Sequence, residues 1–309
     1  MTFYILKRLA GLAGVLLVVS ALTFGLMHAV PGGPFDARSV EKQQMIPPEI
    51  KRQLNIKYGF DQPVWRQYLL FLRNAARLDF GYSLAYPGRT VAQIFREQWP
   101  YSVQLGLLTL AFSLLAGVGL GLWAAMRPDS WVDYFSTGLG IFCLVMPVFV
   151  LAILLQLIFA VWLGWLPTGG WTSPRHWVLP VLTNSLGPVL VLLRYTRAGT
   201  GEAMRANYVR TARAKGLSQR RIVLVHVLKN ALTPLLTVGG PLAAGLITGS
   251  FFVESMFRIP GIGFYFVTAI QHRDYPLIMA TTLVWTTLIS VAYLLTDVLY
   301  ALVDPRVKL

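Results

Sequence analysis

Long apolar runs constrain this chain more than any other feature of its sequence. A helix needs roughly 20 apolar residues to cross a bilayer core of about 30 Å, and several runs reach that length. Inside hydrocarbon the backbone polar groups must be satisfied within the protein, so such segments are helical. The charged share of 13% is about half that of a soluble domain. We therefore predict an all-α integral membrane protein with spans at about 9–29, 101–126, 134–163, 177–195, 232–253 and 277–303.

Prolines indicate where these spans begin, bend and end. Pro100 is expected in the first turn of the second span, and Arg127-Pro128-Asp129 is expected to stop it. Pro147 predicts a kink in the third span. Pro180 and Pro188 are tolerated inside the fourth span because neighbouring helices re-satisfy the freed backbone groups.

The distribution of positive charge predicts the orientation of the chain. From the end of the fourth span, with Arg194 included, to the start of the fifth, the chain carries nine Lys or Arg residues and one acid, Glu202, so we place this connection in the cytoplasm. Both termini then lie in the cytoplasm as well, in agreement with Lys7 and Arg8 at the start of the chain. The predicted organisation is an N-terminal anchor helix at 1–30, an extracytoplasmic helical segment at 31–99 and a core domain of five spans at 100–309.

The extracytoplasmic segment is basic, with ten Lys or Arg residues against six acids. A segment of this length largely escapes the charge rule that orients short loops. Proline is favoured in the first turn of a helix. We therefore expect Pro47-Pro48-Glu49 to open one helix and Asp61-Gln62-Pro63 to open another.

The net charge of +14 also raises the question of nucleic-acid binding. Lys and Arg gather where spans meet the cytoplasm, which accounts for the charge without a nucleic-acid partner. No glycine is followed by lysine, so the chain lacks a phosphate-binding P-loop, and it lacks an HExxH zinc motif. We expect no catalytic, cofactor or metal site in this chain, and its single cysteine, Cys143, cannot form an internal disulfide.

The basic connection, at about 199–231, is predicted to be structured. Glu202 to Lys215 is rich in good helix formers, and Gly216 fits the left-handed position that ends a helix. Ser218 can cap a second helix that runs to Asn230 and into the fifth span. Two interpretations stay open from these residues alone: a surface that docks a partner, or a basic amphipathic segment that lies on anionic lipid.

The residues TARAKGL (Thr211 to Leu217) and HVLKNAL (His226 to Leu232) resemble the cytoplasmic signature loop of ABC importer permeases. Gly216 keeps its place in that signature, while Arg210 stands where most branches have glutamate and Lys229 falls near the usual proline. The missing acid favours the oligopeptide, dipeptide and nickel branch, with the oligopeptide members most similar. Further motifs of that branch follow in order: MHAVPGGPF (27–35), IPPEIKRQLNIKYGFDQPVWRQY (46–68), DFGYS (79–83), LPTGGW (166–171), GSFFVESMFRIPGIG (249–263), RDYP (273–276) and LYALVDPR (299–306).

The resemblance implies the six transmembrane helices of the type I ABC importer permease fold, in a bacterial or archaeal inner membrane. It implies a homologous second permease, two ATP-binding subunits that carry ATP and Mg, an extracytoplasmic solute-binding protein and a peptide substrate, with a dipeptide or a nickel chelate as alternatives. Ala212 and Gly216 would give a close fit to the ATPase, and Arg210 and Arg213 would contact its acidic groups. The implied coupling helix consists of Tyr208, Arg210, Thr211, Ala212, Arg213, Lys215, Gly216 and Leu217.

Polar residues within the spans are candidates for the translocation path, because leaving them in lipid is costly. The alternative is helix packing, for which Gly245 and Gly249 have the small-xxx-small spacing. Glu254 and Asp297 sit near span ends, where a structural role is expected. The candidate path residues are Thr183, Asn184, Ser185, Thr237, Thr248 and Ser250.

Three other classes of membrane protein remain as alternatives. A proton-coupled peptide symporter needs ionisable groups near the midplane of its spans, and these spans offer almost none away from their ends. A gated channel needs a filter loop, which no segment resembles. A membrane scaffold does not require a basic connection that forms two helices joined at a glycine. The sequence does not determine the length or side chains of the transported peptide.

Overall fold

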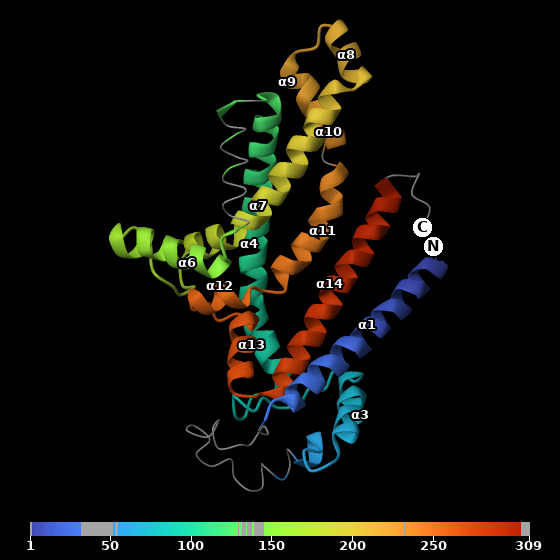
Figure 1. Cartoon of the computed structure of the whole chain (residues 1–309), viewed down its shortest axis with the longest axis vertical. Coiled ribbons are helices and arrows are strands. Elements are labelled where there is room, and N and C mark those ends of the chain that lie inside the picture. The colour runs from blue at the N-terminus through green and yellow to red at the C-terminus, as the bar shows by residue number, and fades with distance from the viewer. Residues whose placement is uncertain are drawn as a thin grey trace. The chain divides into compact units, whose positions relative to one another are not determined.

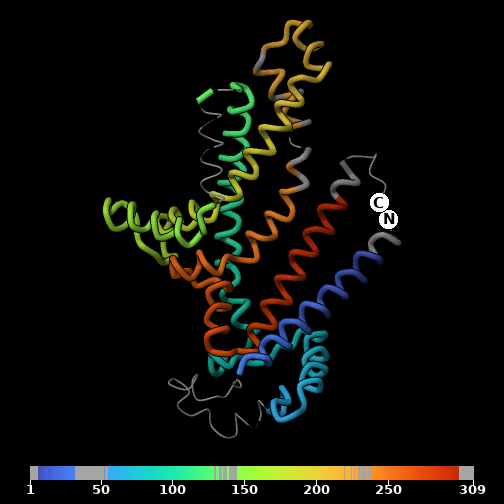
Figure 2. The backbone as a smooth tube through the Cα atoms, in the orientation of Figure 1, coloured from blue at the N-terminus to red at the C-terminus, as the bar shows by residue number. Residues whose placement is uncertain are grey.

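The structure is a computed structural model that describes residues 2–31, 52, 55–128, 130, 131, 134, 138, 145–231 and 233–303. These residues are helices and short connections, with one isolated β-bridge between Tyr82 and Thr90 (Figures 1 and 2). The chain divides into two compact units, which are described separately below. Unit 1 contains Met1–Tyr101 and Pro260–Ser290, and unit 2 contains Ser102–Ile259 and Val291–Leu309.

Among the described residues, four helices are long and apolar enough to cross a membrane: α1 (Thr2–Ala29), α4 (Val91–Met126), α7 (Pro174–Arg205) and α14 (Tyr275–Val303). They confirm the predicted first, second, fourth and sixth spans. Most apolar side chains of α1 are exposed, Leu22 by 62% for example, as expected of a surface that lipid covers.

Helix α4 begins earlier than predicted, and its first turn shows why. Thr90 and Gln93 form a capping box: the Gln93 amide donates to Thr90 Oγ1 at 3.1 Å, and the Thr90 amide donates to Gln93 Oε1 at 2.8 Å. The expectation that Pro100 opens this helix is therefore wrong, since Pro100 lies inside it. The predicted stop is confirmed, because the helix ends at Met126, directly before Arg127.

The predicted third span is only partly helical among the described residues. Helix α6 (Val148–Leu155) continues as the π-helical segment η2 (Gln156–Trp162), and the two together are shorter than a membrane span. Pro147 has an extended backbone, with ψ at 139°, so it precedes the helix and does not kink it. The rest of this prediction, at 135–137 and 139–144, lies outside the described residues.

The predicted fifth span is helix α11 (Thr233–Ile247), which ends before the expected residue 253. Gly249 has a φ of +99°, a conformation that stops a helix and that side chains with a Cβ rarely adopt. A new short helix, α12 (Phe251–Met256), begins after Ser250, whose side chain accepts a hydrogen bond from the Val253 amide at 3.4 Å.

Unit 1 is built around the loop that precedes α4 and the helices that pack against it. Its core packs Val91 and Ile94 against Ile262, from α13 (Ile262–Gln271), and against Leu277. Helix α3 (Val64–Ala75) follows Pro63 and confirms the helix predicted at Asp61-Gln62-Pro63. The helix predicted at Pro47-Pro48-Glu49 lies outside the described residues.

One buried carboxylate ties the loop of unit 1 to the start of α14. Asp274 is fully buried and accepts a hydrogen bond from the Ser83 hydroxyl. It also accepts from the backbone amides of Ala85, at 3.0 Å, and Leu277, at 3.1 Å. Burial raises the pKa of this carboxyl, and these hydrogen bonds oppose the rise.

Unit 2 has an apolar core to which α4, α6, α7 and α12 contribute. Leu105, Ala152, Leu179 and Phe257 are buried together there. The Phe257 carbonyl accepts a hydrogen bond from the Gly170 amide at 2.7 Å, which closes the loop between η2 and α7 over this core. Glu254 is fully buried and accepts from the Ser250 amide at 3.1 Å, in agreement with the structural role expected of it.

Candidate functional site

The basic connection forms a compact hairpin at one end of unit 2, which we call the basic element (206–231). Helix α7 ends at Arg205, and Ala206 is extended, with ψ at 151°. Helix α8 (Asn207–Ala214) follows, and the chain returns through α9 (Gln219–Arg221), η3 (Ile222–Val227) and α10 (Leu228–Ala231). The hairpin projects beyond the end of α4 (Figure 1). The helix expected over 202–215 is therefore interrupted at Ala206.

The turn after α8 is a Schellman motif. Gly216 has a φ of +74°, the left-handed conformation predicted for it. The Leu217 amide donates to the Ala212 carbonyl at 3.3 Å, and the Gly216 amide donates to the Arg213 carbonyl at 2.9 Å. These are the two hydrogen bonds that define the motif, so the direction of the chain after α8 is fixed by its backbone.

Ser218 begins the returning limb, as predicted. The Arg221 amide donates to Ser218 Oγ at 3.4 Å, and the Ile222 amide donates to the Ser218 carbonyl at 3.0 Å. The limb is π-helical over η3 and α-helical in α10. It runs back along α7, so that the element has two connections to unit 2.

The inner side of the basic element is a small apolar core. Val209 and Ala212 from α8 are buried against Ile222, Val227 and Ala231 of the returning limb. Ala212 is only 6% exposed. The expectation that Ala212 gives a close fit to a partner is therefore wrong, because its methyl group packs inside the chain's own core.

The outer side of α8 is polar, basic and centred on a small residue. Successive helical residues are about 100° apart, so Ala214 lies on the face opposite Val209 and Ala212. Arg210 and Thr211 flank Ala214, and all three are exposed. The remaining predicted coupling residues surround this face: Tyr208, Arg213, Lys215 and Gly216 are exposed, and Leu217 is half-buried.

Close backbone contacts join the basic element to the long helices of unit 2. A Cβ placed on Gly199 of α7 would lie 2.8 Å from the carbonyl oxygen of Ala231, so α7 and α10 touch through their backbones. On α4, a Cβ on Gly117 would lie 2.8 Å from the carbonyl oxygen of Val189, and one on Gly121 would lie 2.7 Å from that of Leu193. A side chain at any of these glycines would separate the helices.

The glycine pair that packs helices is therefore on α4 and not on α11, where we expected it. In the part of the chain that the structure describes, no atom of another segment lies within 4 Å of a Cβ on Gly245, and Gly249 lies outside the helix. The motif GVGLG at 117–121 has the same small-xxx-small spacing, so the signal for it was present in the sequence. On α11, Gly240 provides the packing site, since a Cβ there would overlap Thr296 of α14.

The candidate path residues of the fourth span have local hydrogen-bond partners. The hydroxyls of Thr183 and Ser185 are buried and donate to carbonyls of their own helix, at 2.8 Å to Leu179 and 3.0 Å to Leu182. Asn184 donates to Thr109 of α4 at 3.4 Å. These contacts are helix packing, and a role in a translocation path stays a prediction.

The candidate path residues of the fifth span are similar. Thr248 donates to the Gly245 carbonyl at 2.8 Å, and Ser250 caps α12. The side chain of Thr237 lies outside the described residues. Among the path candidates with described side chains, none requires a ligand to satisfy its hydrogen bonds.

Span-length helices joined to a basic element that packs onto one of them define a multi-pass membrane protein with a structured basic loop. The chain belongs to the family of binding-protein-dependent transport system inner membrane components, whose model matches residues 117–309. A second model, for the N-terminal part of such components, matches residues 1–104. The family has the type I ABC permease fold and comprises membrane permeases that are not themselves enzymes.

Curated relatives cover the whole chain. It is 38% identical over 309 residues to the dipeptide transport system permease protein DppB of Bacillus subtilis, covering 100% of this chain and 99% of the relative. It is 37% identical over 307 residues to the oligopeptide transport system permease protein OppB of Haemophilus influenzae, with 99% of each covered. It is 36% identical over 307 residues to OppB of Escherichia coli, again with 99% of each covered.

Proposed function

We propose that this chain is the membrane-spanning subunit of an ATP-driven importer of peptides, and that the basic element receives the motion of an ATPase subunit. A homologous second permease completes the translocation path, two ATPases bind ATP and Mg on the cytoplasmic side, and an extracytoplasmic binding protein delivers the peptide. In this proposal both termini and the basic element lie in the cytoplasm. Family membership and the names of the relatives support the proposal.

The two-sided construction of α8 is the observation that carries this assignment. Val209 and Ala212 fix one side of the helix inside the chain, while Arg210 stays exposed on the other side and Arg213 stays exposed at the edge of that side. A basic segment that only lies on lipid would present apolar side chains to the membrane. Here the apolar side is covered by the returning limb, so the exposed side is available to an acidic groove of a partner.

The substrate is proposed as a peptide, and among peptides as an oligopeptide. The relatives named for dipeptide transport and those named for oligopeptide transport are nearly equally identical to this chain. The preference for oligopeptides therefore depends on the motifs of the sequence. Uptake of labelled dipeptides, pentapeptides and a nickel chelate by cells that express the complete transporter separates the three substrates.

Charge reversal on α8 tests the docking role. We expect Arg210→Glu combined with Arg213→Glu to weaken the association of the ATPase by at least tenfold, about 1.4 kcal/mol, because two attractive contacts become repulsive. The measurement is ATPase retained on the tagged permease during purification, together with peptide uptake. The matched control is Arg127→Glu, an exposed cation that follows α4 outside the basic element.

The possible outcomes separate the alternatives. Loss of ATPase and uptake in the double variant, with the control unchanged, supports docking. Full uptake by the double variant would exclude α8 as the ATPase contact. Purification of a homo-oligomer without any ATPase would contradict the importer proposal and favour a secondary transporter.

A further inference from the structure

The exposed side of α3 has two adjacent stripes of opposite character. Trp65, Leu69, Leu72 and Ala76 recur at helical spacing and form an apolar stripe, with Trp65 exposed by 61% and Leu69 by 55%. Arg66, Arg73 and Arg77 have nearly the same spacing one residue further along, so they form a basic stripe about 100° around the helix. Arg73 and Arg77 have no ion-pair partner among the residues that the structure describes.

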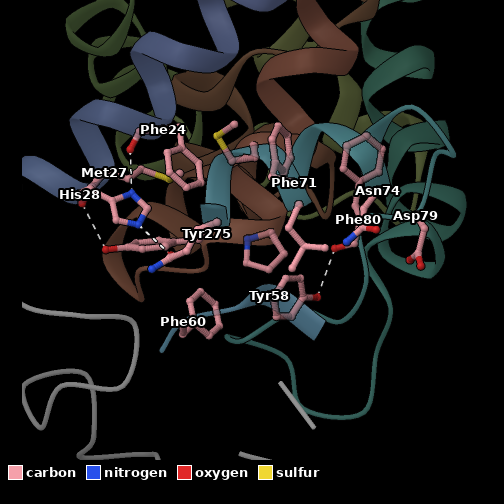
Figure 3. A pocket seen from close by; sticks show the side chains of 14 residues that line it. Phe24, Met27, His28, Tyr58, Phe60, Phe71, Asn74, Asp79, Phe80 and Tyr275 are labelled. Atoms are coloured by element: carbon pink, nitrogen blue, oxygen red, sulfur yellow. Dashed lines mark hydrogen bonds between the residues drawn. The ribbon is translucent and has the colours of Figure 1, made fainter. Parts of the chain in front are cut away.

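The opposite side of α3 is occupied within unit 1. Gln67, Leu70, Phe71 and Asn74 line a cavity between α3, the end of α1 and the start of α14 (Figure 3). The cavity measures about 40 Å³, enough for a few water molecules and too small for a peptide. The inner side of α3 is therefore fixed by contacts within the chain, and the two stripes face away from it.

Hydrogen bonds to α1 determine how deep α3 lies in the membrane. The Tyr68 hydroxyl donates to the Leu17 carbonyl at 3.2 Å and lies 2.9 Å from Ser20 Oγ. The outer end of α1 is marked by Met27, whose carbonyl accepts a hydrogen bond from Tyr275 at the start of the span in α14. At 1.5 Å per residue, Leu17 is about 15 Å along the helix from Met27, or about 11 Å in depth at a tilt of 40°.

A tyrosine side chain covers only part of that distance, so part of α3 lies below the outer end of the span. Tyr68, which points toward the middle of α1, is three residues after Trp65. On the helix surface it therefore lies next to the apolar stripe and nearly opposite the basic stripe. The apolar stripe is therefore on the side of the bilayer centre, and the arginines are on the side of the headgroups. Amphipathic helices that lie about 5–10 Å into the headgroup and acyl boundary have this arrangement.

We propose that α3 is an interfacial helix embedded in the lipid leaflet at the outer end of α1, and not part of a water-exposed extracytoplasmic layer. Its apolar stripe contacts acyl chains and continues the lipid-facing surface of α1, and its basic stripe binds the phosphates of anionic phospholipids. Trp65 of the apolar stripe also contacts the basic stripe, because the Arg66 guanidinium lies 5.3 Å from the centre of its ring, and tryptophan is enriched at membrane interfaces. That this is the outer leaflet depends on the orientation proposed above, whereas contact with lipid does not.

The test uses the complete transporter in nanodiscs, with Cys143→Ser as the background. A fluorescent NBD group is attached at Leu69→Cys on α3, at Leu22→Cys on the exposed side of α1, or at Asp61→Cys in the turn before α3. A phospholipid with a nitroxide on its fifth acyl carbon quenches probes in the leaflet, and iodide quenches probes in water. We expect the Leu69 probe to behave like the Leu22 probe, and the Asp61 probe to be quenched by iodide.

Two outcomes would overturn the proposal. Iodide quenching at Leu69 equal to that at Asp61 would place the stripe in water. Protection of Leu69 from both quenchers, or protection that depends on adding the binding protein, would mean that a protein covers the stripe. Neither outcome affects ATPase docking, because the probes report on lipid contact even in an inactive complex.

The basic stripe has its own readout. We expect nitroxide-labelled phosphatidylglycerol to quench the Leu69 probe more strongly than labelled phosphatidylcholine. The triple variant Arg66→Gln, Arg73→Gln and Arg77→Gln should abolish that difference, while Arg96→Gln, an exposed arginine on α4, should preserve it. If the two labelled lipids quench the Leu69 probe equally in the protein that keeps all three arginines, the assignment of these arginines to phosphate binding is overturned.

Discussion

Gly199 and Ala231 are 32 positions apart in the sequence and are in backbone contact. A Cβ on Gly199 would lie 2.8 Å from the Ala231 carbonyl oxygen, a separation at which backbone has to move. This contact holds the returning limb of the basic element against α7. Because α7 also packs on α4 through Gly117 and Gly121, we expect a displacement of α8 to move two span-length helices.

Gly199→Ala tests this contact. We expect the added methyl group to separate α7 from α10 and to cost about 1–3 kcal/mol through overpacking. Peptide uptake per ATP hydrolysed, measured in proteoliposomes, should fall while the ATPase stays bound. The control is Gly201→Ala on the same helix, where a Cβ meets nothing within 4 Å. Unchanged coupling in Gly199→Ala would mean that the contact does not transmit motion.

A glutamate introduced on either side of α8 should have two different effects. Ala214→Glu adds an acid to the exposed side, so we expect a folded permease that retains less ATPase. Ala212→Glu buries a charge in the apolar core of the basic element, a change that costs several kcal/mol and unfolds the element. Limited proteolysis within 206–231 distinguishes the two variants, because only Ala212→Glu should be cleaved faster than the wild type. Equal protease sensitivity would contradict the assignment of Ala212 to the buried side of α8 and of Ala214 to the exposed side.

The left-handed conformation of Gly216 predicts a graded response to substitution. No described residue lies within 4 Å of a Cβ at this position, so it is the backbone conformation that opposes a side chain. We expect Gly216→Val to cost at least 1–2 kcal/mol and to reduce uptake, whereas Gly216→Asn should be close to the wild type because asparagine tolerates this conformation. Thermal unfolding and uptake measure the two effects, and equal behaviour of both variants would show that the conformation is not required.

Asp274 predicts a pH dependence of the stability of unit 1. Its pKa is raised above the usual value of about 3.8 by burial, so the native state holds this proton more tightly than the unfolded state. The stabilisation that comes from this bound proton is complete when the pH is below the usual carboxyl pKa, and it is lost as the pH rises through the pKa of Asp274 in the folded state. Asp274→Asn should remove this dependence, at a cost of about 1 kcal/mol for the lost hydrogen bond from Ala85.

Hydrogen exchange of the amides at 83–86, followed against pH, measures this effect. After correction for the intrinsic exchange rate, these amides of the wild type should exchange faster as the pH rises from the usual carboxyl pKa through the raised pKa of Asp274. In Asp274→Asn the corrected exchange rate should not depend on pH in this range. Ser83→Ala is the companion variant, because it removes the hydroxyl that donates to the carboxylate but keeps the titrating group. A pH dependence that persists in Asp274→Asn would assign it to a different group.

Local patterns in the sequence predicted those features that depend on neighbouring residues. Gly216 and Ser218 have fixed roles because a left-handed turn and a helix cap each involve only a few consecutive residues. The helix after Pro63 and the end of α4 before Arg127 follow from the same kind of local signal.

Features that depend on contacts between distant segments were not predicted. Ala212 is a small residue in a basic loop, and only the packing of the returning limb shows that it is buried. Pro100 is an exception, because α4 is begun by the capping box of Thr90 and Gln93, a local signal that the prediction overlooked, and the proline is tolerated within the helix. Gly245 and Gly249 have the same spacing in the sequence as Gly117 and Gly121, and the different roles of the two pairs become visible only with the partner helices in place.

The single extended residue Ala206 has a mechanical consequence. On its own, one non-helical residue between α7 and α8 would be a hinge that absorbs any push on α8. The returning limb begins after Gly216 and packs against α7 at Gly199, so the basic element is held at both of its ends. Force applied at α8 would therefore tilt α7 and the returning limb together instead of closing the angle at Ala206.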